Sequence, residues 1–283
     1  MSINANDIKT LREKTGAGMM DCKKALTEAA GDAAAAEKLL KEWGLAGVEK
    51  RAGRATNEGR VFLKETESKI AMIEIACETD FVARNEDFIK AGQKVADLAF
   101  DGDIAAANDK LEGMVKDIAS VIKENITLRR VALVKAKAGE WLHSYVHGEG
   151  KIGVVVTAKA DKAEAWKNAA VTGFVHDVAL HIAAFRPMFL DQSQVAADYI
   201  AEQKGIFEKQ IEGDEKMKGK PANVVEGIVK GKIQKLMADI CLMDQGFVKD
   251  EKQKVSKVMA DLAKAAGVEL SITGFVAFRV GQE

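Results

Sequence analysis

The chain has 283 residues, of which 47% are hydrophobic and 30% are charged. This length is enough for two or three domains, and the composition is that of a globular protein with a buried core, which excludes disorder as the default. The 42 basic and 43 acidic side chains give a formal net charge of -1, so no bulk field attracts nucleic acid or an anionic membrane, while a local patch remains open.

The three cysteines, Cys22, Cys77 and Cys241, lie far apart, include no CxxC pair and are odd in number. This pattern argues against a disulfide framework and against a zinc site, and it fits a reducing compartment. The first residues lack the apolar core of a signal peptide, and no run approaches the roughly 18 apolar residues that span a bilayer. We therefore expect a soluble, cytoplasmic protein with no cofactor, no membrane contact and no direct nucleic-acid partner.

Residues 1–54 predict a compact module of three short helices. Each helix is bounded by a residue that can begin it and one that can end it: Asn6 and Gly16, Gly18 and Gly31, and Asp32 and Gly44. So small a module buries little surface, so we expect spare apolar side chains such as Met19 and Met20 to contact another molecule. The alternative is that both methionines fill the core of the module.

After a basic, glycine-containing linker, the hydrophobic period changes from 3.6 to 2. Residues 61–63 and 70–77 predict a β-hairpin, Asn85 can cap a following helix, and a second helix carries Leu111 and Ile118 on one face. A strand over 126–136 completes this unit, which we assign to residues 55–138.

The same order returns after Gly139. Residues 139–158 predict a second hairpin, a helix over 172–185 ends before Pro187, and a strand over 272–280 resembles 126–134. The sequence therefore predicts an α+β fold with a duplicated core of two small antiparallel sheets covered by helices. The second subdomain comprises residues 139–190 and 241–283.

An inserted segment, residues 191–240, interrupts the second subdomain. Residues 193–212 and 221–240 have helical patterns and flank the polar sequence GDEKMKGK, and Pro221 suits a first helical position. Apolar residues recur at steps of three and four in the second helix: Val225, Val229, Ile233, Leu236 and Ile240. We expect an antiparallel, coiled-coil-like hairpin, whose exposed apolar side chains would allow a homodimer or a scaffold role.

The apolar run 70–77 breaks into Thr79-Asp80-Phe81-Val82, which puts a phenylalanine and a carboxylate where a polar turn is expected. In one interpretation Asp80 caps a helical turn and Phe81 folds back into the core of its own domain. In the other, the corner is exposed and acts on a second molecule.

Five segments, in order along nearly the whole chain, resemble the elongation factor Ts family. They are LREKTGAGMMDCKKAL (11–26), CETDFVARNEDF (77–88), SYVHGEGKIGVVV (144–156), HIAAFRPMFL (181–190) and CLMDQGFVKD (241–250). The resemblance implies a nucleotide-exchange factor for the GTPase elongation factor Tu, with an N-terminal module of ubiquitin-associated (UBA) type. Exchange makes and breaks no covalent bond, so no catalytic residue is expected.

The resemblance also implies which residues contact the partner. Four residues would enter the GTPase domain beside its magnesium and phosphate site: Thr79, Asp80, Phe81 and Val82. The module around Lys23 would hold the same domain, and the hairpin of Tyr145 and His147 would lie against another domain. Two features depart from the family pattern: the sequence ends at Glu283 where some members continue, and Gly246 stands where many have proline, which we expect to loosen a turn.

An enzyme is the alternative of another class, and little in the sequence favours it. His143 and His147 share a strand face, but His176 and His181 are five residues apart on a helix, about 140° of rotation, so that pair cannot chelate a metal. No GxxxxGK[ST] loop is present. The scaffold alternative differs from the exchange factor in one observable, which is whether binding changes nucleotide release.

Overall fold

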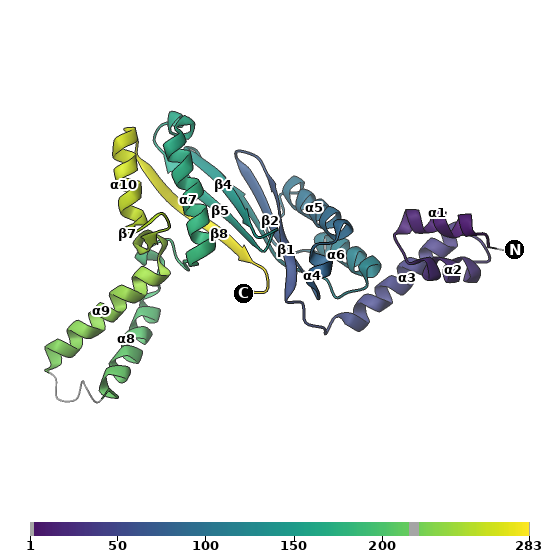
Figure 1. Ribbon diagram of the computed structural model, residues 1–283, viewed down its shortest axis with the longest axis horizontal. Helices are drawn as coiled ribbons and strands as arrows, with labels where there is room; N and C mark the ends of the chain where they lie inside the picture. Colours follow the sequence, from purple (N-terminus) through teal and green to yellow (C-terminus); the bar gives the residue numbers. More distant parts are fainter. Residues whose placement is uncertain (1–2, 215–220, 283) are drawn as a thin grey trace. The chain divides into compact units, whose positions relative to one another are not determined.

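The computed structural model describes residues 3–214 and 221–282 and combines helices with small antiparallel sheets, which confirms the α+β class (Figure 1). The chain forms two compact units. The first comprises Met1–Lys135, Val146–Gly153 and Phe278–Glu283, and the second comprises Ala136–Tyr145 and Val154–Ala277. Within the described ranges, no helix is long and apolar enough to cross a membrane.

The first unit begins with three helices, α1 (Ala5–Thr15), α2 (Met19–Glu28) and α3 (Ala33–Arg51). They enclose a small core of Leu11, Cys22, Ala25, Leu26 and Ala36. Gly16, Gly18 and Asp32 bound the helices as predicted, whereas α2 ends at Glu28, before the predicted Gly31.

The predicted cap of α1 was wrong. Asn4, not Asn6, caps the helix: its side chain accepts from Asp7 N at 2.8 Å, and its N–H donates to the Asp7 carboxylate at 3.4 Å. This reciprocal pair requires a carboxylate three residues after the cap. Asn6 has Lys9 at that position, so it cannot form the pair.

Gly44 does not end α3, which continues to Arg51. A Cβ on Gly44 would lie 2.7 Å from the Ser120 Cβ of α6 (Asp109–Ile122). The glycine is therefore a point of close approach between two helices, a role that local pattern does not distinguish from a helix end.

The sheet of the first unit has the antiparallel order β1-β2-β3, formed by Glu58–Glu65, Lys69–Cys77 and Thr127–Lys135. Two helices, α5 (Glu86–Asp101) and α6, pack on it around a core that includes Phe62, Ile73 and Phe88. Asn85 caps α5 as predicted, because its side chain accepts from two backbone amides of the first turn.

A second sheet has the order β4-β5-β8, and most of each strand belongs to the second unit. Its strands are β4 (Glu140–His147), β5 (Ile152–Ala160) and β8 (Leu270–Arg279). This unit also contains the 3-10 turn η1 (Ala163–Lys167), α7 (Ala169–Phe185), the short strands β6 (Gly246–Phe247) and β7 (Asp250–Lys254), and α10 (Val255–Ala266). Gly246 lies at a close approach of two backbone segments, because a Cβ there would lie 2.5 Å from the Glu251 carbonyl oxygen.

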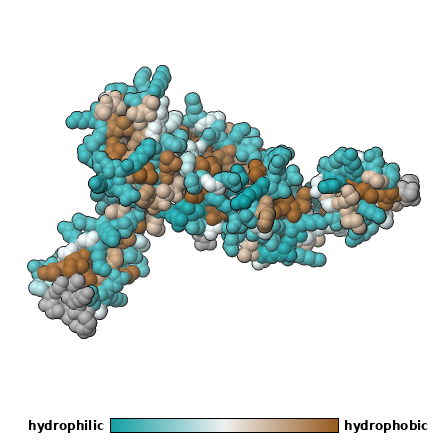
Figure 2. All heavy atoms as spheres, viewed as in Figure 1, coloured by the Kyte–Doolittle hydropathy of each residue, from teal (hydrophilic) through white to brown (hydrophobic). Residues whose placement is uncertain are grey.

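Helices α8 (Ala197–Glu212) and α9 (Ala222–Ile240) pack side by side, with a 3-10 turn, η2 (Gln192–Gln194), before them and another, η4 (Leu242–Asp244), after them. Pro221 precedes the first residue of α9 rather than occupying it. Figure 2 shows apolar side chains along this pair, bordered by hydrophilic ones. Most of the predicted turn, residues 215–220, lies outside the described residues.

Candidate exchange site

The segment Thr79–Val82, called here the 79–82 corner, leaves the end of β2 and forms most of a single helical turn, α4 (Asp80–Ala83). Thr79 caps the turn, because its hydroxyl oxygen accepts from Val82 N at 3.3 Å. The Phe81 side chain is 83% exposed. The interpretation in which Asp80 is the cap and Phe81 fills the core is therefore wrong.

Asp80 lies beside a small charged recess. The Arg84 guanidinium is 3.8 Å from the Asp80 carboxylate and 3.7 Å from that of Glu149. The recess has a volume of about 370 Å³ and is lined by Gly59, Asp80, Ala83, Arg84, Gly148, Glu149 and Lys151. Because Arg84 and Glu149 are largely exposed and Asp80 is nearly half exposed, these pairs contribute little to stability and can exchange for other partners.

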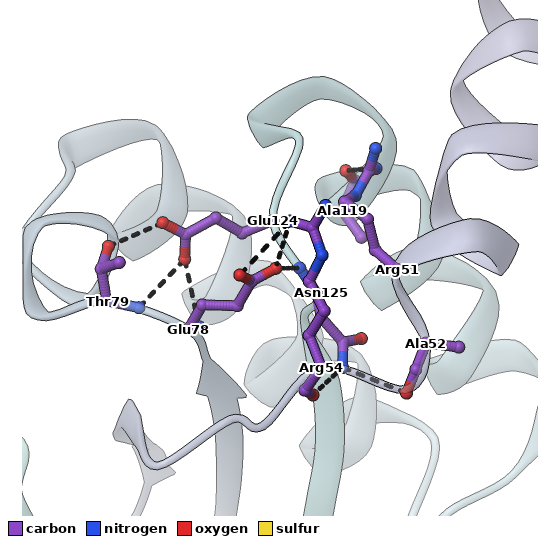
Figure 3. Close-up of polar contacts among 8 residues, drawn as sticks. All are labelled: Arg51, Ala52, Arg54, Glu78, Thr79, Ala119, Glu124 and Asn125. Carbon is purple, nitrogen blue, oxygen red and sulfur yellow. Dashed lines mark hydrogen bonds and ion pairs between the residues drawn. The ribbon is translucent and has the colours of Figure 1, made fainter.

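Glu124, just after α6, holds the base of the corner (Figure 3). One carboxylate oxygen accepts from Glu78 N and Thr79 N, both at 3.1 Å, and the other accepts from the Thr79 hydroxyl at 2.6 Å. Sequence reasoning missed this residue. The signal for it is weak but physical: a carboxylate next to a helix C-terminus is electrostatically disfavoured unless donors nearby compensate.

The neighbouring residue, Asn125, joins the corner to the linker that follows α3. The Glu78 carboxylate accepts from Asn125 N at 2.6 Å and from the Arg54 guanidinium at 3.3 Å. The Asn125 side chain is buried and donates to the carbonyl oxygens of Ala52 and Arg54, at 3.3 and 2.7 Å. Both sides of this junction are therefore fixed by hydrogen bonds.

Helix α6 also contacts the three-helix module. The Arg51 guanidinium donates to the Ala119 carbonyl oxygen at 3.0 Å, and Lys123 forms an ion pair with Asp21. These contacts use the C-terminal turn of α6, which is the turn that precedes Glu124. One short segment therefore supports both the module and the corner.

The other predicted contact residues of the module are exposed. Met19 and Met20 lie in the first turn of α2 with 56% and 74% of their surface exposed, and Lys23 is also exposed. The alternative in which both methionines fill the core of the module is wrong.

Tyr145 and His147 both lie on β4. Tyr145 is half-buried, with the His176 ring edge-on at a centroid distance of 5.7 Å, and His147 is exposed. His143 Nε2 lies 2.9 Å from His176 Nδ1, a strand-to-helix pairing that the sequence does not reveal. Among residues 3–214 and 221–282, no group of three or more His, Cys, Asp or Glu side chains could hold a metal ion.

Comparison with known proteins gives the family. A sequence model described as Elongation factor TS matches residues 78–282. The curated Elongation factor Ts of Treponema denticola is 48% identical over 281 residues, which covers 99% of each chain. Those of Treponema pallidum (strain Nichols) and Borrelia recurrentis are 42% and 41% identical, over 99% of this chain and 99% and 100% of theirs. The chain belongs to the elongation factor Ts family.

This membership makes the chain a factor of translation elongation and gives the site its context. In this member of the elongation factor Ts family, burial first and Glu124 second raise the pKa of the Cys77 thiol to about 12. Cys77 ends β2 two residues before the corner, and its thiol donates to the Thr79 carbonyl oxygen at 3.2 Å. A thiol with so high a pKa stays protonated, so Cys77 acts here as a buried structural group and not as a nucleophile.

Proposed function

We propose that the chain is the nucleotide-exchange factor of elongation factor Tu. It binds the GDP form of that GTPase, disturbs the magnesium and phosphate site and so promotes GDP release, after which GTP can bind. The observation that carries the proposal is Phe81, an 83% exposed phenylalanine on a hydrogen-bonded turn with the Asp80 carboxylate beside it. A phenylalanine whose ring is exposed to water in the free protein suits a surface that another protein covers on binding.

The mechanism requires binding energy and no covalent chemistry. Phe81 acts as an apolar wedge between packed elements of the GTPase, and Asp80 places a negative charge near groups that organise the magnesium ion. By linkage, whatever weakens nucleotide binding is itself weakened by nucleotide, so the exchange reaction is reversible. No cofactor and no catalytic residue of this chain take part.

Magnitudes show that one side chain is not enough. A ten-thousandfold acceleration of release needs about 5.5 kcal/mol, while burying a phenylalanine contributes about 1.5 to 3 kcal/mol. Further contacts must therefore hold the two proteins together while the corner acts. We assign that role to Met19, Met20 and Lys23, which would contact the GTPase domain of the partner, and to Tyr145 and His147, which would contact a second domain of the partner.

The proposed division of labour follows four segments. Residues 1–54 form a UBA-like module, 55–138 and 139–190 with 241–283 form the two core subdomains, and 191–240 forms an inserted, coiled-coil-like hairpin. The protein acts in the cytoplasm, where translation takes place, and makes no direct contact with nucleic acid or membrane.

The test measures release of a fluorescent GDP analogue from elongation factor Tu, with this chain at catalytic and at saturating concentrations. The native chain should accelerate release, and Phe81→Ala and Asp80→Asn should each reduce that acceleration at least tenfold without loss of folded structure. Met188→Ala is the matched control, because Met188 is 62% exposed and lies outside the proposed contacts. If the native chain binds the GTPase but leaves the release rate unchanged, the proposal fails.

A second candidate function rests on the α8–α9 pair. Ile206 and Val224 are 40% and 39% exposed there, and burying them against a second copy would form a homodimer through residues 191–240. Sedimentation equilibrium at micromolar concentration tests this. A dimer that Ile206→Glu dissociates would support it, and a monomeric mass for the native chain would refute it.

A further inference from the structure

The Thr79 hydroxyl has its hydrogen-bonding capacity committed on two sides. It donates its proton to Glu124 at 2.6 Å and accepts from Val82 N at 3.3 Å. A hydroxyl normally rotates to suit its surroundings. Here the Glu124 carboxylate takes the proton, so a lone pair of the Thr79 oxygen faces the amide that it caps. The cap of α4 is thus oriented by a residue 45 positions away.

The same carboxylate fixes the backbone that enters the turn. Glu78 N and Thr79 N both donate to one Glu124 oxygen at 3.1 Å (Figure 3). Hydrogen bonds to an ionised carboxylate are about twice as strong as neutral ones. Three of them therefore fix the direction in which the chain leaves β2, and α4 follows that direction.

The anchor is reciprocal. The backbone of 78–79 donates to the Glu124 side chain, and the Glu78 side chain accepts from the backbone of the next residue, Asn125. Asn125 is 4% exposed and holds the linker carbonyls of Ala52 and Arg54. Neither residues 78–79 nor residues 124–125 can shift without breaking hydrogen bonds on both sides. Glu124 is therefore held in place and can position the corner.

Phe81 depends on this arrangement. Its ring is 83% exposed, so packing within the chain does little to fix the direction in which it points. That direction comes mainly from the backbone of α4 and hence from its cap. If the cap loosens, the turn samples other conformations, and ordering it again on binding costs conformational entropy.

We propose that Glu124 is the positioning residue of the 79–82 corner: it presents Phe81 to the GTPase without contacting the GTPase itself. This inference rests on the proposed exchange function and names a residue that acts through Phe81. Under this inference Glu124 affects the rate of nucleotide release and not the affinity for the partner, because the other proposed contacts, on α2 and β4, do not involve Glu124.

The experiment compares Glu124→Ala, Glu124→Gln and the control Glu112→Ala in the GDP-release assay. Glu112 is an exposed carboxylate in the first turn of α6, the helix that precedes Glu124, so its removal changes the charge of α6 but not the anchor. Glu124→Ala should lower the maximal release rate about tenfold, the equivalent of about 1.4 kcal/mol, and leave the half-saturating concentration within about twofold of the native value. Glu112→Ala should match the native chain.

Glu124→Gln should keep the rate within about threefold of native. Its amide oxygen can accept from the two backbone N–H groups, and its amide nitrogen can donate to the Thr79 oxygen, which has a second lone pair. In a Phe81→Ala background, adding Glu124→Ala should cost less than about twofold more, because a residue that acts through Phe81 has nothing left to position.

Near-UV circular dichroism and urea unfolding establish that each variant is folded. If Glu124→Ala unfolds, Thr79→Val decides, because it removes the hydroxyl that Glu124 orients: it should lower the maximal release rate about tenfold and leave the half-saturating concentration within about twofold of the native value. A native chain without exchange activity overturns the proposed function and this inference together. If the native chain is active, the inference alone is overturned when Glu124→Ala (or, if that variant unfolds, Thr79→Val) releases nucleotide at the native rate. It is also overturned when that variant changes only the half-saturating concentration, or when the defects of Glu124→Ala and Phe81→Ala multiply in the double variant.

Discussion

Replacing Glu74 by leucine should destabilise the β1–β3 sheet strongly. Glu74 is 2% exposed at the centre of β2 and lies opposite Arg130 of β3. The guanidinium donates to Glu74 Oε2 from Nε at 2.7 Å and from Nη2 at 2.5 Å. The second carboxylate oxygen accepts from Gly281 N at 3.3 Å, so the pair also holds the end of the chain.

The magnitude follows from what the substitution leaves behind. Removing one partner of a buried ion pair costs about 3 to 5 kcal/mol, because the other charge stays buried and unpaired. Arg130 is 28% exposed and Nη2 also donates to the Arg279 carbonyl oxygen at 2.8 Å, so the remaining charge is partly compensated and we expect about 3 kcal/mol. With a urea m-value of about 2 kcal/mol per molar, the midpoint should fall by about 1.5 M.

Urea unfolding read by peptide-resolved hydrogen exchange measures this, because it follows the β1–β3 sheet separately from the second unit. The double variant Glu74→Leu with Arg130→Leu is the decisive comparison. It removes both charges together and should recover most of the loss, since apolar pairs of similar volume replace buried ion pairs at little cost. A loss below about 1 kcal/mol in Glu74→Leu, or a double variant no more stable than the single one, would refute the reasoning.

Three further predictions follow from local geometry. Gly92→Ala should destabilise the protein by about 1 to 3 kcal/mol, because its Cβ would lie 2.2 Å from the Phe62 ring. The control Gly113→Ala, in open space on α6, should stabilise the protein by about 0.5 to 1 kcal/mol. Urea midpoints that rise for both variants would contradict this. Burial lowers the pKa of His181 despite its hydrogen bond to Gln245, so the unfolded chain binds the proton more readily, and the free energy of unfolding should fall as the pH drops below about 6.5. Urea titrations at pH 7.5 and 5.5 should show this fall for the native chain and a smaller one for His181→Leu. Equal falls would exclude His181 as the cause. The pKa of about 12 at Cys77 should slow alkylation of the thiol at pH 8 on the order of a thousandfold relative to the urea-unfolded chain. Peptide mapping measures both rates, and comparable rates would show that the thiol is accessible and ionisable.

Local features were predictable because their hydrogen bonds span only a few residues. The caps at Asp32 and Asn85 each bond to backbone amides two and three positions ahead, so the sequence contains the whole interaction. The change of hydrophobic period at the start of the first hairpin likewise located β1 and β2. The family resemblance rested on such contiguous segments and was confirmed.

Features decided by distant residues were not predictable. Gly44 has the local appearance of a helix end, but the surface of α6 requires a residue without a side chain there. The 79–82 corner was found from its odd composition, yet whether Phe81 faced the core or the solvent depended on packing that the motif does not contain. The pairing of His143 with His176 has the same cause, since a strand and a helix bring them together.

By itself, then, the sequence determined the order of most helices and strands, several caps, the α+β class and the family of this protein, because periodicity, capping and motif spacing are properties of neighbouring residues. Only the tertiary structure decided that Phe81 and the two methionines are exposed and that Glu124 and Asn125 hold the corner to the linker. A carboxylate that follows a helix acquires a role only when the fold brings backbone donors to it. Those donors come from a segment 45 and 46 positions away.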